Sequence, residues 1–438
     1  MASIHEMLLG EYDLVIYIDT ETRSECDLLK CGGWKYAEDR TTEIMMASMI
    51  VYSAGQRESP TRANYLSPCI DTMIMAAVAY EEQHHNPHVA NIALVAHNMD
   101  GFEYPIFMQE EVFELLQSYH PDLRVDCFDS ATFCRMNGVP ASLNHAAQYL
   151  LCETKLETGT RLINTYSKPR KDGAFNILEH NAADLAEMID YCDRDTALVK
   201  RVCEVMYLAS YITLELYLRQ ADSIRTLNDR GVSVAVDDIE DITAAVAEAK
   251  AFIDRAICDK TAGSVAKASS LPSLKRWVSF QTPLYDAGQT LDVARRADIM
   301  ADKTCPEIVR RVLTLVDAGN SASVKKYTAF ANYMCEDEII RGCYVDHGAG
   351  QTTRLSSRGV QLHNMNRDTL DSESLNTLVT DPQRWGARMI LENAAKAVRQ
   401  MIIPRRPDAA FIMADWSNIE ARVTPWLANT TEALSKLE

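Results

Sequence analysis

The stretch LVIYIDTE, from Leu14 to Glu21, carries the strongest fold signal in this 438-residue chain. Its first five residues are apolar and rich in β-branched side chains, which is typical of a buried strand. Asp19 and Glu21 follow two residues apart, so an extended backbone places both carboxylates on one face. Because like charges on one face repel each other, the pair favours a divalent cation between them. An isolated Asp-x-Glu is more often a solvated strand end, so the neighbouring elements decide.

The regions around this stretch indicate a mixed α/β domain. Two more apolar runs, 44–52 and 92–96, predict further strands, and the helical spacing of 182–208 predicts a long helix. Strands with helices between and after them indicate an α/β domain that closes near residue 205.

The rest of the chain has a different pattern. Residues 211–332 predict mostly helices, and the Gly-, Ser- and Arg-rich residues 341–367 predict loops with short strands. Residues 391–402 predict an amphipathic helix. The apolar run 409–414 predicts a final buried strand that ends at Asp415.

Composition narrows the class of protein. The chain is 47% hydrophobic and 24% charged, which is typical of a globular protein, and its length predicts two to three domains. The 12 cysteines form no Cys-x-x-Cys pair, so we expect free thiols and no zinc site. We expect no membrane span and, from residues 1–10, no secretion signal.

Charge is distributed unevenly. The net charge is −18, and residues 1–210 hold twice as many acidic as basic residues, whereas the second half is nearly balanced. A carboxylate-rich metal site therefore suits the first half, and contact with a nucleic-acid backbone suits the second half better.

Two later motifs add to the acidic pair. HNMDGFE, residues 97–103, follows the strand at 92–96 and offers Glu103, with Asp100 as its rival. YCDRD, residues 191–195, lies in the long helix and offers Asp195, with Asp193 as its rival. Tyr191 and Asp195 are four residues apart and so share a helix face.

In this order and at these separations, the motifs resemble the exonuclease domain of the DEDD superfamily, which has a ribonuclease-H-like fold. Residues 26–39 and 161–170 look like the matching region of bacteriophage polymerases related to bacterial DNA polymerase I. The resemblance implies two Mg²⁺ or Mn²⁺ ions on four carboxylates, an attacking water oriented by Tyr191 and a DNA contact by Asn98. The four carboxylates are Asp19, Glu21, Glu103 and Asp195. Many relatives have Asp where this chain has Glu103.

The second half resembles the thumb-to-palm region of family A DNA polymerases, on residues 341–344 and 347–364. The resemblance implies that Arg354 contacts the primer. It also implies that Gln361, His363 and Asn364 line the minor groove, where amides and cations meet acceptors at nearly every base pair. A Gly normally precedes the matching Arg, whereas this chain has Thr353.

DWSNIEARV, residues 415–423, looks like the first catalytic palm motif of the same polymerases. Asp415 would bind both metal ions, Glu420 would pack against the sugar of the incoming nucleotide, and Arg422 belongs to the same nucleotide-binding motif. Ser417-x-x-Glu420 also fits a capping box, and Pro425 falls where the helix should continue.

We therefore expect an α/β fold in three parts. They are a ribonuclease-H-like DEDD exonuclease domain at 1–208, a helical thumb at 209–340 and an incomplete palm at 341–438. The fingers helix and the last palm motif of the family are not found among the 438 residues, so we expect this chain alone not to polymerise.

The expected function is a proofreading 3′–5′ exonuclease and primer-template-binding subunit of a split phage polymerase. It would act in the cytoplasm of a host bacterium on a single-stranded 3′ end and a primer-template. A second polypeptide would supply the fingers and the remaining palm. The alternatives are a free-standing DNA exonuclease with a vestigial polymerase remnant and a non-catalytic DNA-binding partner.

Overall fold

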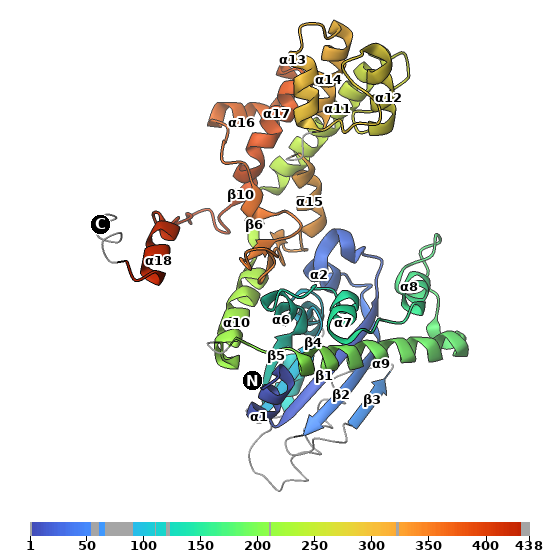
Figure 1. Cartoon of the computed structure of the whole chain (residues 1–438), viewed down its shortest axis with the longest axis vertical. Coiled ribbons are helices and arrows are strands. Elements are labelled where there is room, and N and C mark those ends of the chain that lie inside the picture. Colours follow the sequence, from blue (N-terminus) through green and yellow to red (C-terminus); the bar gives the residue numbers. More distant parts are fainter. Residues whose placement is uncertain are drawn as a thin grey trace. The chain divides into compact units, whose positions relative to one another are not determined.

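The structure is a computed structural model that describes residues 2–53, 61–65, 91–109, 111–119, 123–209, 212–320 and 324–430. It divides into two compact units, Met1–Ile402 and Ile403–Glu438. The first unit contains a five-stranded sheet with helices packed around it, followed by a mainly helical part (Figure 1). The fold is thus mixed α/β and mostly helical.

The sheet has the strand order β3-β2-β1-β4-β5. Its central strand, β1, is antiparallel to β2 and parallel to β4, and β4 is parallel to β5. The strands expected at 14–18, 44–52 and 92–96 are confirmed as β1, β2 and β4. The strand bounds are β1 Leu14–Arg23, β2 Glu43–Ser53, β3 Thr61–Tyr65, β4 Asn91–Ala96 and β5 Arg124–Asp129.

Strand β1 runs further than the sequence predicts. We expected it to end at residues 19–21, but it continues to Arg23, with a bulge after Glu21. The reason is the length of β2, whose Ser48 lies opposite Asp19 and whose Met46 lies opposite Glu21. The acidic pair therefore has the fixed backbone of a paired central strand.

Side chains alternate across β1 into two separate cores. Val15 and Tyr17 belong to one core, while Ile16 and Ile18 belong to the other. The expected long helix is confirmed as α9, which packs on β1 and β2. The helices around the sheet are α1 Ile4–Glu11, α2 Leu28–Glu38, α4 Glu103–Gln109, α5 Val112–Tyr119, α6 Ser130–Met136, α7 Leu143–Leu151, α8 Thr158–Leu162 and α9 Ala182–Val205.

The helical part has its own core, built from buried residues between Val234 and Met401. The expected helical middle is confirmed, but the helix expected at 391–402 begins earlier and ends at Ala397. The helices are α10 Leu214–Arg230, α11 Val236–Lys260, α12 Leu271–Gln281, α13 Val293–Ala301, α14 Glu307–Gly319, α15 Lys325–Tyr333, α16 Ser372–Thr380 and α17 Ala387–Ala397. The short strands are β6 Val232–Val234, β7 Ile339–Ile340, β8 Tyr344–Val345, β9 Ser356–Ser357 and β10 Ile402–Ile403.

The second unit contradicts the expectation of a buried strand at 409–414. These residues form no strand, and Ile412 is 96% exposed. A strand needs a neighbour to bond its backbone groups, and the described residues provide none for this segment. Helix α18, Ile419–Leu427, follows and runs through Pro425. Its N-cap is Asn418, without a side-chain hydrogen bond, so the Ser417 capping box does not form.

No helix in the described ranges combines the length and the apolar character needed to cross a membrane.

Candidate metal centre

Three of the four predicted carboxylates lie together. One oxygen each of Asp19, Glu21 and Asp195 lies within 4.8 Å of the other two. Asp19 and Glu21 point to the same face of β1, as their spacing predicts, and α9 carries Asp195 onto that face. Strand β1 and helix α9 are far apart in the sequence, so their carboxylates come together only because α9 packs on β1.

Burial makes this cluster electrostatically costly. Burial, followed by the charge of Asp195, raises the pKa of Asp19 to about 7. Burial and the charge of Asp19 raise the pKa of Glu21 well above its ordinary value. Burial also raises the pKa of Asp195, although Lys155 opposes that shift. The cluster therefore holds more negative charge than its surroundings favour.

Glu103 lies nearby but outside the three-carboxylate set. It is the first residue of α4 and is only 2% exposed. Burial and the charge of Asp19 raise the pKa of Glu103 well above its ordinary value. Its Oε2 atom is buried and accepts no hydrogen bond from the described residues.

The rival carboxylates have other partners. Asp100 accepts a hydrogen bond of 2.7 Å from Nε of Arg225, which is buried in α10. Asp193 accepts a hydrogen bond from the Ser48 hydroxyl on β2. Among the described residues, Asp195 belongs to the three-carboxylate cluster, whereas Asp100 and Asp193 do not.

Tyr191 lies one helical turn before Asp195 in α9 and is 5% exposed. Its ring packs directly against Gly159 in α8, where an added Cβ atom would lie 2.1 Å from Cε2 of Tyr191. Only glycine permits this approach. Burial raises the pKa of the Tyr191 phenol above its ordinary value, so the hydroxyl keeps its proton at neutral pH.

Lys155 is a member of this site that the sequence did not single out. Its ammonium forms an ion pair with Asp195 and lies 5.0 Å from the centroid of the Tyr191 ring. Burial alone would lower the pKa of Lys155, but its interactions with Asp195, Tyr191 and Asp19 raise it above its ordinary value. A single lysine in a loop belongs to no pattern, so no sequence signal marks it.

Asn98 begins the turn that leads into α4. It adopts a left-handed conformation with φ of 73°, and its backbone N–H donates to Oδ1 of buried Asp129 at 2.8 Å. The turn thereby fixes where α4, and with it Glu103, begins.

The residues expected to contact primer-template lie together on and after the β8–β9 hairpin. Arg354, Gln361, His363 and Asn364 are all exposed. Thr353, at the position where the resemblance predicts a glycine, takes the left-handed φ of 52° that glycine adopts more easily.

Asp415, Glu420 and Arg422 belong to the second unit. Asp415 and Glu420 are exposed, whereas Arg422 is half-buried and its Nε donates to the backbone oxygen of Ser417 at 3.1 Å.

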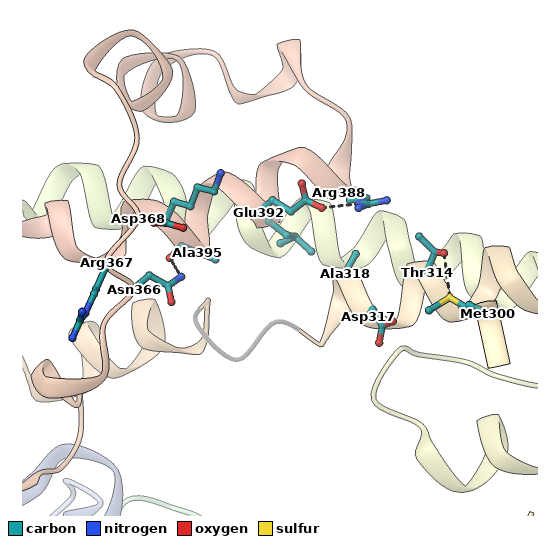
Figure 2. Close-up of a pocket in the computed structure, with 12 residues that line it drawn as sticks. Met300, Thr314, Asp317, Ala318, Asn366, Arg367, Asp368, Arg388, Glu392 and Ala395 are labelled. Carbon is teal, nitrogen blue, oxygen red and sulfur yellow. Dashed lines mark hydrogen bonds and ion pairs between the residues drawn. The ribbon is translucent and has the colours of Figure 1, made fainter. Parts of the chain in front are cut away.

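A cavity of about 790 Å³ lies in the helical part, between α14, α17 and the segment before α16 (Figure 2). Its walls carry both signs of charge, including the ion pair of Arg388 and Glu392 at 2.7 Å. None of the predicted site residues lines it, and its balanced charge favours no anionic ligand.

The residues of the carboxylate cluster fit a divalent cation. They offer only oxygen ligands, which suit Mg²⁺ and Mn²⁺. A cation would also relieve the repulsion between Asp19, Glu21 and Asp195 and give Oε2 of Glu103 the partner it lacks.

Comparison with known proteins supports a relation to DNA polymerases. No family model matches the chain. A DNA polymerase of Bacillus phage SP02 is 26% identical over 434 residues, which cover 94% of this chain and 61% of that protein. The chain thus spans about three-fifths of the length of this relative and resembles it along nearly its own whole length. The resemblance to a phage polymerase that the motifs suggested is confirmed.

Among solved structures, the chain is similar to the POL domain of Pol1 from M. smegmatis in complex with DNA primer-template and dNTP. The sequence identity is 15% and the TM-score is 0.49, with 99% of this chain and 62% of that chain covered. A likeness at this level does not establish a shared fold.

Proposed function

We propose that this chain is a metal-dependent 3′–5′ exonuclease that proofreads for a DNA polymerase of the phage, family A type. The observation that carries the proposal is the cluster of half-buried Asp19 with buried Glu21 and Asp195, whose ligand oxygens lie within 4.8 Å of one another. Such a cluster has a high electrostatic cost without a cation, and the polymerase-like sequence gives it a substrate class.

In this proposal, Asp19, Glu21, Glu103 and Asp195 hold one or two divalent ions. Such ions, when bound, make hydroxide available from water near neutral pH and stabilise the charge that develops on the phosphate. Tyr191 keeps its proton because burial raises its pKa, so it can orient a water by hydrogen bonding but cannot serve as a base. Asn98 lies at the turn before Glu103, where it can contact the terminal nucleotide.

The test uses a single-stranded DNA oligonucleotide labelled at its 5′ end. We expect a ladder of products shortened from the 3′ end with Mg²⁺ or Mn²⁺ and no products with chelator. Asp19→Ala should abolish the ladder, and a 3′-terminal phosphorothioate should block it in the wild type. Undiminished degradation by Asp19→Ala would refute the assignment, whereas no degradation by the wild type would favour a non-catalytic DNA-binding role.

We also propose that the second half binds primer-template. Arg354, Gln361, His363 and Asn364 are exposed on one hairpin and its exit, as a DNA-contacting set requires. Arg354→Ala should weaken primer-template binding in a salt-dependent manner, reducing the slope of log affinity against log salt by about one.

The same proposal includes a partner polypeptide that carries fingers and the remaining palm. It is supported by the apolar side chains of the second unit, which are exposed to an extent unusual for a monomer. They are Phe411, Ile412, Met413, Trp416, Trp426 and Leu427.

Co-expression with a phage polypeptide that carries the fingers and later palm motifs tests the pairing. A stable complex that incorporates nucleotides should form, and Asp415→Ala should abolish incorporation but not exonuclease activity. Failure to associate would leave the alternative of a free-standing exonuclease.

A further inference from the structure

Ion pairs and a hydrogen bond hold the loop after α7, at residues 153–155, against α9, and we call this set of contacts the clamp. Glu153 pairs with Arg194 at 2.7 Å and also with Arg201, and both arginines belong to α9. Nη2 of Arg194 also donates to the backbone oxygen of Thr154 at 3.3 Å. Four groups from one short loop and one helix thus hold the backbone that carries Lys155.

A further contact fixes Lys155 itself. Its backbone N–H donates to Oδ1 of Asn144 in α7 at 2.9 Å. The side chain then reaches inward, so that its ammonium pairs with Asp195, which is 1% exposed. The clamp therefore delivers one fixed positive charge into the cluster of Asp19, Glu21 and Asp195.

This position conflicts with a bound metal ion. The ammonium contacts Oδ2 of Asp195, one of the two oxygens that the carboxylate can offer to a metal. Two positive charges about 4 Å apart repel each other strongly near a protein surface, and more strongly in its interior, because little water screens them there. Metal binding at Asp195 must therefore displace the ammonium or work against it.

We propose that Lys155 is a tethered counter-ion that occupies Asp195 when no metal is bound and competes there with the divalent cation. The inference rests on the proposed exonuclease function. Lys155 is a positioning residue in this scheme: it keeps Asp195 and Tyr191 aligned in the metal-free site and weakens metal binding at Asp195.

The competition is tested by Mn²⁺ binding to the full chain, measured by electron paramagnetic resonance or calorimetry. Lys155→Met should tighten the site that includes Asp195 by roughly tenfold, because the competing charge is gone. Glu153→Gln, which loosens the clamp and leaves the ammonium in place, should shift affinity in the same direction by less. The matched control is Lys30→Met, which breaks an exposed pair with Asp27 (3.0 Å).

Thermal unfolding separates this role from two others. Lys155→Met should lower Tm in chelator more than in saturating Mn²⁺, since the ion replaces the lost charge. An equal loss in both conditions would mean a purely structural residue and would overturn the proposal. Unchanged Mn²⁺ affinity with a raised KM for single-stranded DNA would mean a phosphate contact and would also overturn it.

The two proposals fail in different ways. If the wild type binds no Mn²⁺, or Asp19→Ala binds it equally well, the proposed exonuclease site is wrong. If Asp19→Ala loses Mn²⁺ binding while Lys155→Met and Glu153→Gln bind like the wild type, only the competition is wrong.

Discussion

Two acidic motifs of this chain have opposite surroundings. Asp19 follows an apolar run inside a paired central strand, where α9 covers it. Asp415 also follows an apolar run, but Ile412 and Met413 before it are 96% and 93% exposed. Similar local sequences therefore form different structures. Among the described residues, only the segment before Asp19 has neighbouring elements that hydrogen-bond to its backbone and bury its apolar side chains.

The difference bears on function. A metal site needs ligands held in place before the ion arrives, and the packing around Asp19, Glu21 and Asp195 provides this. The segment around Asp415 has no comparable support from the described residues. In the proposed function, the first site is therefore built by this chain alone, whereas the second would need a partner that covers Phe411, Ile412 and Trp416.

The largest effect should come from removing one carboxylate in each region. Asp195→Ala should reduce exonuclease turnover by on the order of 10³-fold, because a lost metal ligand removes several kcal/mol of transition-state stabilisation. Asp415→Ala should leave this activity unchanged. Initial rates of mononucleotide release from single-stranded DNA measure both, and a similar loss in the two variants would break the comparison.

Shortening one apolar side chain in each region should change the free energy of unfolding by very different amounts. Leu94→Ala, at a fully buried position of β4, should lower the free energy of unfolding by roughly 2–5 kcal/mol. Ile412→Ala should change it by less than about 0.5 kcal/mol, because the side chain is already in water. Urea unfolding of both variants tests this. A large loss for Ile412→Ala would show that its segment packs in the isolated chain.

The sheet could be predicted from the sequence because its signals are local. The runs at 14–18, 44–52 and 92–96 are apolar and short, and the alternation of Asp19 and Glu21 follows from strand geometry alone. The same reasoning failed at 409–414, since strand formation depends on a partner that local sequence does not reveal.

Within the candidate site, the sequence indicated the residues that lie in recognisable motifs. It missed Lys155, whose place in the site depends only on contacts in the folded chain. The motif favoured Glu103 over Asp100, and only the structure shows that Asp100 forms an ion pair with Arg225. Lys155 is 40 residues from Asp195 and reaches it only through the clamp on α9, so no spacing rule could place it.

A substitution at Gly159 tests the role of Tyr191 in the proposed exonuclease site. Gly159→Ala would place a methyl group 2.1 Å from the Tyr191 ring, so the ring must move. We expect kcat to fall by about 10²-fold, the usual cost of misplacing a group that orients a reactant by about 1 Å. KM for single-stranded DNA should stay unchanged.

Gly138→Ala is the matched control for side-chain space, because nothing lies within 4 Å of an added Cβ there, although its φ of 66° carries its own backbone cost. Loss of activity in both variants, in proportion to their loss of stability, would remove the special role of Tyr191.

The smallest predicted effect is a pH dependence of stability that comes from the carboxylate cluster. The pKa of Asp19 rises from 3.8 to about 7 on folding, so between these values the folded chain binds protons more tightly than the unfolded chain. In chelator, this contribution to stability is present below pH 4 and is lost as the pH rises through 7. The pKa values of Glu21 and Glu103 shift in the same direction.

Urea unfolding from pH 5 to pH 8 in chelator should therefore give a shallower decline for Asp19→Asn than for the wild type. Mg²⁺ should flatten the wild-type decline, because the ion favours the ionised carboxylates. Asp415→Asn should follow the wild type, since its carboxylate is exposed. Parallel curves for Asp19→Asn and the wild type would mean that ionisation of Asp19 does not change the stability of the folded chain. The two regions would then differ in structure but not in electrostatic cost.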